Sequence, residues 1–348
     1  MSDGPRPALP DERERAATLS QLLRAGGAAR PDAIFARIGS NGGEAAAALR
    51  VAAIDALADH YCARFRDAGV GEGERIVILG APEPRALAAL VGALRAGLNV
   101  VLAPAALDAG AIADAARRCN ATALAGPTEF ASLRLGERLF EAAAKVDEVS
   151  LVALYGEGAA GALALDAPQE EEATPPASPV DPELLTIDVL DAVSVCAPLS
   201  QSQAADIARA FLARAGLCPG QAIASMISLG SAAGLVGGAF APLIGGAHVV
   251  WQAPFAALRF VEALDASAPA HLFAPASAVE ALGAAGLLTP QRLASLTLVA
   301  AAGAKIPAFP HQLDLARVCV LRVGAGADLR LDAFEAPPDA AGGPAAAG

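Results

Sequence analysis

The fold is decided by the stretch DALADHYCARFRDAGVGEGERIVILGAPEPRALAALVGALRAGLNVVLAPAAL at residues 55–107. At its start, residues 54–68 carry apolar side chains at helical spacing and are followed by glycine, which is typical of a helix end. Two short apolar runs, 75–80 and 99–104, predict buried strands, and the segment 84–97 between them predicts a helix. A strand, a helix and a second strand in this order indicate a parallel α/β sheet.

The same alternation continues through the rest of the chain. An acidic, proline-rich segment at 166–182 predicts a solvated linker between two units. We therefore expect a flexible leader at 1–17, a first α/β subdomain at 18–165, a second at 183–335 and a mobile tail at 336–348. In the second subdomain the predicted strands are 192–196, 222–228, 247–251, 271–275, 296–302 and 317–323, and the predicted helices are 201–215, 233–244, 256–265, 276–285 and 290–294.

Composition narrows the class of protein. Of the 348 residues, 55% are hydrophobic and 18% are charged, which predicts a buried globular core. The net charge of −12 argues against a nucleic-acid or anionic-membrane surface. Residues 222–251 lack charged side chains, but glycines and a proline interrupt them, so we interpret them as buried strands around a small-residue helix.

The cysteines and histidines of the sequence are not spaced as the ligands of a metal site usually are. The five cysteines occur without a CxxC pair, and the four histidines are scattered. We interpret the cysteines as free thiols of a cytoplasmic protein. The polar N-terminus carries no apolar core of signal-peptide type.

Several segments together resemble the adenylate-forming (AMP-binding) superfamily, which includes acyl-CoA synthetases, peptide-synthetase adenylation domains and firefly luciferase. The resemblance covers roughly residues 20–330, and its most specific part is residues 55–107. It implies the large N-terminal domain of an acyl-CoA synthetase: two stacked α/β subdomains with largely parallel sheets, lacking the small C-terminal domain. The other matching segments are RPDAIF (30–35), APLIGGAHVVW (241–251), PAHLFAPASAVEAL (269–282) and SLTLVAAAGAKIP (295–307).

The catalytic motifs of that family are degenerate in this sequence. In the family, a Gly/Ser/Thr-rich phosphate loop ending in lysine follows the strand that corresponds to 192–196. Here the stretch DAVSVCAPLSQSQAADIA at 191–208 passes from strand to helix without glycine, threonine or lysine. Glycine lets backbone N–H groups turn toward a phosphate, and a cation balances its charge. Ser200 and Gln203 instead fit a helix capping box.

The other family positions are also altered. The adenine-side motif aligns with 301–305, and the motif that stacks on adenine and contacts phosphate and magnesium aligns with 324–328, where only Asp328 could contact a cation. The resemblance implies an acyl pocket, and a vestigial nucleotide or acyl site would then be made by Met226, Gly230, Gly234, Phe273, Gly303 and Asp328. The alternative is that these are ordinary core and loop residues.

These losses favour a non-catalytic protein. Removing one donor that stabilises transition-state charge costs about 2.7–4 kcal/mol, and here several are missing together. We expect a pseudoenzyme that is a binding, scaffold or regulatory subunit, with a protein partner or self-association, no nucleic acid, no membrane and no cofactor. Two alternatives stay open. One is a sensor for a carboxylic acid, an acyl-CoA or a nucleotide; the other is a component of an AMP-forming acid ligase that uses ATP and magnesium only with a second chain.

Overall fold

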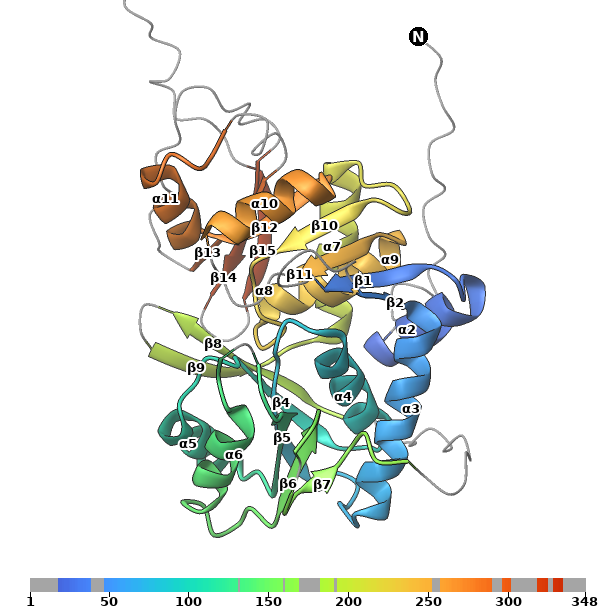
Figure 1. Cartoon of the computed structure of the whole chain (residues 1–348), viewed down its shortest axis with the longest axis vertical. Coiled ribbons are helices and arrows are strands. Elements are labelled where there is room, and N and C mark those ends of the chain that lie inside the picture. Colours follow the sequence, from blue (N-terminus) through green and yellow to red (C-terminus); the bar gives the residue numbers. More distant parts are fainter. Residues whose placement is uncertain are drawn as a thin grey trace, which may run out of the picture.

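The computed structural model describes residues 18–38, 47–130, 132–158, 160–168, 182–190, 193–251, 257–289, 296–301, 318–324 and 328–333. These residues form two α/β lobes, each built on its own sheet, one below the other in Figure 1. None of the helices in this part of the chain is long and apolar enough to cross a membrane. The predicted helix 290–294, the leader 1–17 and the tail 336–348 lie outside the described residues, as does most of the predicted linker.

The lower lobe contains a seven-stranded sheet in the order β7-β6-β5-β3-β4-β8-β9. Its strands pair in parallel except for the antiparallel hairpin β8–β9. The predicted strand–helix–strand unit is confirmed as β3 (Arg75–Leu79), α4 (Pro84–Arg95) and β4 (Asn99–Ala103). The other elements are α5 (Ala109–Cys119), β5 (Ala123–Pro127), α6 (Leu135–Ala143), β6 (Leu151–Tyr155), β7 (Leu163–Ala164), β8 (Leu184–Leu190) and β9 (Val193–Pro198).

The upper lobe contains an eight-stranded sheet in the order β15-β14-β13-β12-β10-β11-β1-β2. Its central strands are parallel, and the hairpin β1–β2 and the pair β14–β15 close its two edges in antiparallel fashion. The strands are β1 (Ile34–Ile38), β2 (Ala47–Arg50), β10 (Ala222–Ser225), β11 (His248–Trp251), β12 (His271–Pro275), β13 (Leu296–Ala301), β14 (Cys319–Val323) and β15 (Leu329–Ala333). The helices are α7 (Gln201–Ala215), α8 (Ala232–Leu235), the π-helical turn η1 (Val236–Phe240), α9 (Ala241–Gly245), α10 (Ala257–Ser267) and α11 (Ala276–Ala284).

The sheets do not divide the chain at the predicted linker. β1 and β2, from the N-terminal part of the sequence, pair with the upper sheet through β11. β8 and β9 follow the linker in sequence but extend the lower sheet through β4. The subdomain boundaries drawn at 18–165 and 183–335 therefore do not coincide with the two sheets, because strand pairing across long sequence separations decides sheet membership.

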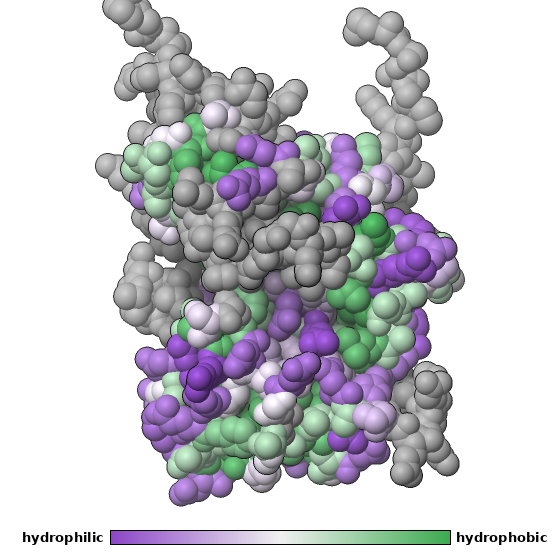
Figure 2. Space-filling view, in the orientation of Figure 1, coloured by the Kyte–Doolittle hydropathy of each residue, from purple (hydrophilic) through white to green (hydrophobic). Residues whose placement is uncertain are grey.

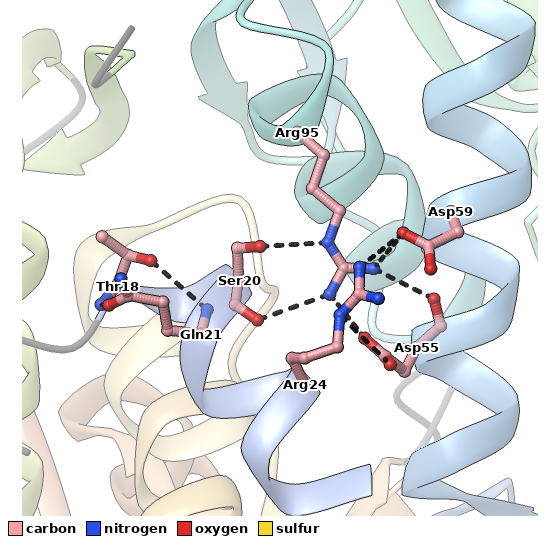
Figure 3. Close-up of polar contacts among 7 residues, drawn as sticks. All are labelled: Thr18, Ser20, Gln21, Arg24, Asp55, Asp59 and Arg95. Carbon is pink, nitrogen blue, oxygen red and sulfur yellow. Dashed lines mark hydrogen bonds and ion pairs between the residues drawn. The ribbon is translucent and has the colours of Figure 1, made fainter. Parts of the chain in front are cut away.

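A buried arginine joins three helices through polar contacts (Figure 3). Arg95, at the end of α4, is only 7% exposed. Its guanidinium reaches Asp55 Oδ1 at 2.5 Å and Asp59 Oδ1 at 2.9 Å, both on α3 (Val51–Asp67), and Ser20 Oγ at 3.0 Å on α2 (Leu19–Ala29). Because a buried charge is tolerated only when it is paired and hydrogen-bonded, this network fixes α2, α3 and α4 relative to one another.

Candidate functional site

The junction between β9 and α7 is short. Only Leu199 and Ser200 separate the last residue of β9 from the first residue of α7. The Ser200 hydroxyl accepts a hydrogen bond from Gln203 N at 3.3 Å, which confirms the Ser200 half of the predicted capping box. Leu19 N donates to the Gln201 side-chain oxygen at 2.8 Å, which ties the first turn of α7 to α2. The junction is thus a capped and packed helix start.

α7 packs on the upper sheet through aromatic side chains. The ring of Phe211 lies 4.7 Å from that of Phe273 and 4.8 Å from that of His271, both on β12. His271 is buried and shares a hydrogen bond with the Thr297 hydroxyl. Burial lowers the pKa of His271 to about 3, so the imidazole is neutral at physiological pH. His271 therefore has the environment of a core histidine.

Gly230, one of the predicted pocket residues, lies where the two lobes touch. Gly230 N donates to Gly80 O at 3.1 Å, and the Ser228 hydroxyl donates to the same carbonyl oxygen. A Cβ atom on Gly230 would lie 2.3 Å from Ala103 O, and one on Gly80 would lie 2.3 Å from Gly230 N. Glycine is required on both sides because backbone meets backbone there.

Of the remaining predicted pocket residues, Met226, Gly234 and Phe273 lie in tightly packed surroundings. Met226 N donates to Phe273 O at 2.9 Å, which places Met226 directly beside β12. A Cβ atom on Gly234 would lie 1.7 Å from Ser228 O. One on Gly237, in the π-helical turn, would lie 2.6 Å from the Phe273 ring. Gly303 lies outside the described residues.

The N-terminus of the helix that begins at α8 is occupied by protein groups. Ala232 N donates to Asp188 Oδ1 at 3.2 Å, and Gly234 N donates to Ser231 Oγ at 3.1 Å. A helix N-terminus attracts anions because its N–H groups are free and its dipole is positive. Here a carboxylate from β8 and a serine hydroxyl take the place that an anionic ligand group would need.

Asp188 is the residue that sequence reasoning missed at this site. It is 7% exposed and accepts a second hydrogen bond, from the Thr186 hydroxyl at 2.9 Å. Burial raises the pKa of Asp188, while the hydrogen bonds from Thr186 and Ala232 act in the opposite direction. The signal in the sequence is that Asp188 is the one charged residue of the strand LLTIDVL, whose other residues except Thr186 are apolar.

Asp328 immediately precedes β15 and is partly exposed. Its carboxylate accepts from Arg330 Nε at 3.0 Å, and its side chain is 52% exposed. Among the residues that the structure describes, no group of three or more His, Cys, Asp or Glu side chains is placed to hold a metal ion. Asp328 is therefore a half-exposed carboxylate that is already paired with Arg330.

The comparisons with known proteins agree with this fold. Residues 28–187 match the family model of AMP-binding enzymes. No curated protein matches the chain in sequence. The apo structure of MbtA from Mycobacterium smegmatis is 18% identical with a TM-score of 0.73, covering 95% of this chain and 63% of that one. The anthranilate CoA ligase AuaEII, solved with anthranoyl-AMP, is 14% identical with a TM-score of 0.69, covering 90% of this chain and 59% of that one.

A further structure, the amide bond synthetase McbA from Marinactinospora thermotolerans, is 19% identical with a TM-score of 0.65 and covers 87% of this chain and 59% of that one. The chain has the fold of the N-terminal domain of adenylate-forming ligases, as the resemblance predicted. It spans about three fifths of the length of these structures. The family match ends at residue 187, before β9 and the junction with α7, so similarity beyond that residue is one of fold.

Proposed function

We propose that this protein is a non-catalytic acyl-CoA synthetase-like protein that acts as a binding, scaffold or regulatory subunit. The observation that carries the proposal is the direct passage from β9 to α7. Transfer of the adenylyl group of ATP to a carboxylate, with release of pyrophosphate, depends on positioned donors and a cation around the phosphates. Two residues, one of which caps the helix, leave no loop in which such donors could be arranged.

The positions of the lysines support the same proposal. The lysines of the sequence are Lys145 and Lys305. Lys145 follows α6 in the lower lobe, where its ammonium is paired with Glu141 at 2.7 Å. Lys305 lies outside the described residues. The α7 junction therefore has no lysine in its own sequence, and the donors at α8 are used within the protein.

The well-packed fold favours the interpretation that the protein is retained because it binds a partner. The capped start of α7 and the close contact between the lobes at Gly230 are locally satisfied structures. A chain that had lost all use would not be held to such close packing, since most substitutions destabilise. Polar and apolar residues are interspersed over the visible face of the lower lobe in Figure 2, so a partner would meet a mixed surface there.

The proposal is tested by co-purification from the native host, with a tagged copy of the chain at its natural expression level. An unrelated tagged protein of similar acidity is the control. We expect a specific partner in fixed ratio, or a self-associated complex by light scattering. A monomer that captures no partner at any concentration would contradict the proposal. A thermal shift with carboxylic acids or acyl-CoAs would instead favour the sensor.

A further inference from the structure

Two cysteines that are far apart in the sequence lie side by side in the lower lobe. Cys119 is the last residue of α5, and Cys196 lies on β9, four residues before the Ser200 cap. Their sulfur atoms are 3.3 Å apart and share a hydrogen bond. A disulfide bond is about 2.05 Å long, so the sulfurs need to approach by only about 1.3 Å to form one.

The surroundings favour ionisation of one thiol of this pair. The hydrogen bond from Cys196 lowers the pKa of Cys119 to about 7, against the effect of burial, and Arg75 and Arg118 act in the same direction. The same hydrogen bond, together with burial, raises the pKa of Cys196. Cys119 is buried and Cys196, beside it, is partly exposed, so an oxidant approaches the pair from the side of Cys196. A small oxidant could therefore reach a pair in which one sulfur is a nucleophile and the other stands ready to resolve it.

We propose that Cys119 and Cys196 form a reversible redox modification site whose oxidant is a small hydroperoxide and whose product is an intramolecular disulfide. In the first step the Cys119 thiolate attacks one peroxide oxygen. An S–O bond forms, the O–O bond breaks, and the leaving hydroxide takes a proton to become water. In the second step the Cys196 sulfur attacks the sulfenic sulfur of Cys119. The S–S bond forms, the S–O bond breaks, and the departing hydroxide takes the Cys196 proton. The pair loses two electrons, and hydrogen peroxide is reduced to two waters.

The bond would act on the β9–α7 junction. β9 is the edge strand of the lower sheet and pairs only with β8 in the sheet order. A disulfide would tie this edge covalently to the end of α5, close to the strand that leads into α7. Closing a loop between residues 119 and 196 also restricts the unfolded chain, so the oxidised protein is expected to be more stable. This inference is independent of the proposed function.

The test uses the full chain, reduced, desalted and exposed to hydrogen peroxide. Free thiols are then alkylated, and the cysteine peptides are mapped by mass spectrometry. We expect a 119–196 disulfide that a thiol reductant reverses, and a Tm rise of roughly 3–6 °C on oxidation. Cys119→Ser and Cys196→Ser should each abolish the rise, while the exposed Cys218, changed in Cys218→Ser, should leave it intact.

Two results would overturn the proposal. One is that both thiols stay free at peroxide concentrations that oxidise Cys218. The other is that oxidation yields scrambled or intermolecular disulfides without preference for the 119–196 pair. If either serine variant fails to fold, peptide mapping of the wild-type chain still decides, because it needs no variant.

Discussion

Arg95 is expected to be the most stabilising charged residue among those that the structure describes. In Arg95→Met, a side chain of similar length keeps the packing but leaves Asp55 and Asp59 without their main partner. These two carboxylates lie one helical turn apart on α3, and their side chains are only 16% and 20% exposed. Breaking a buried pair by removing one partner costs about 3–5 kcal/mol.

A second arginine, Arg24, lowers the expected free-energy cost of Arg95→Met. The Arg24 guanidinium also reaches Asp59 at 2.8 Å and Asp55 at 3.6 Å, so it can neutralise part of the charge that loss of Arg95 leaves unpaired. We therefore expect Arg95→Met to cost about 3 kcal/mol in the free energy of unfolding. For a chain of 348 residues, with an unfolding entropy of about 0.7 kcal/mol/K, that corresponds to a fall in Tm of about 4 °C.

The matched control is Arg24→Met, which removes the second arginine of the same cluster. The Arg24 side chain is 47% exposed, and exposed ion pairs contribute about 0–1 kcal/mol. Thermal unfolding followed by circular dichroism at neutral pH measures both variants. Adding Asp55→Asn to Arg95→Met should restore part of the loss, since it removes one unpaired charge. Equal Tm values for the two arginine variants would refute the reasoning.

Three further predictions concern packing and ionisation. Gly230→Ala should destabilise the protein by more than about 3 kcal/mol, because its Cβ atom would lie 2.3 Å from Ala103 O. Gly283→Ala, whose Cβ atom would have its nearest neighbour at 3.9 Å, should stabilise α11 by about 0.5–1 kcal/mol. Urea unfolding measures both variants, and similar losses of stability would contradict the close contact between the lobes. Burial raises the pKa of Glu83 to about 7, so the folded state holds a proton that the unfolded chain releases, and the free energy of unfolding should fall as pH rises from 4.5 to 7. Glu83→Gln should remove about 2 kcal/mol of this pH dependence from unfolding curves. An unchanged pH profile in the variant would count against the raised pKa. The Tyr155 hydroxyl is buried without a hydrogen-bond partner, so Tyr155→Phe should be neutral or stabilising by about 1 kcal/mol. Tyr61→Phe loses a hydrogen bond to Asp166 and should destabilise the protein. If Tm falls in Tyr155→Phe and not in Tyr61→Phe, Tyr155 has a partner.

The lower lobe could be predicted from sequence where each element carries its own periodic pattern. The strands β3 and β4 and the helix α4 between them lie within three residues of the predicted ranges, because short apolar runs and terminal glycines are local signals. The edge hairpins β1–β2 and β8–β9 were not predicted as such. Their pairing depends on neighbours far away in the sequence, and this information is absent from a local pattern.

The candidate site shows the same limit. The cap at Ser200 follows from two residues at a fixed spacing, so the sequence suffices to predict it. The close contact at Gly230 requires knowing that Gly80 and Ala103, in the other lobe, face it. The contact between Cys119 and Cys196 brings together residues 77 positions apart with no shared motif, so only the folded chain shows it.

We propose that the short passage from β9 to α7 leaves this chain unable to carry out ordinary adenylate formation. ATP–pyrophosphate exchange by the purified protein, with magnesium and a panel of carboxylic acids, tests it most directly. An active adenylate-forming ligase assayed in parallel is the positive control. We predict exchange at the background level for every acid. Exchange above background that is lost in Asp328→Asn but kept in Asp332→Asn, a second exposed and ion-paired carboxylate, would contradict the claim.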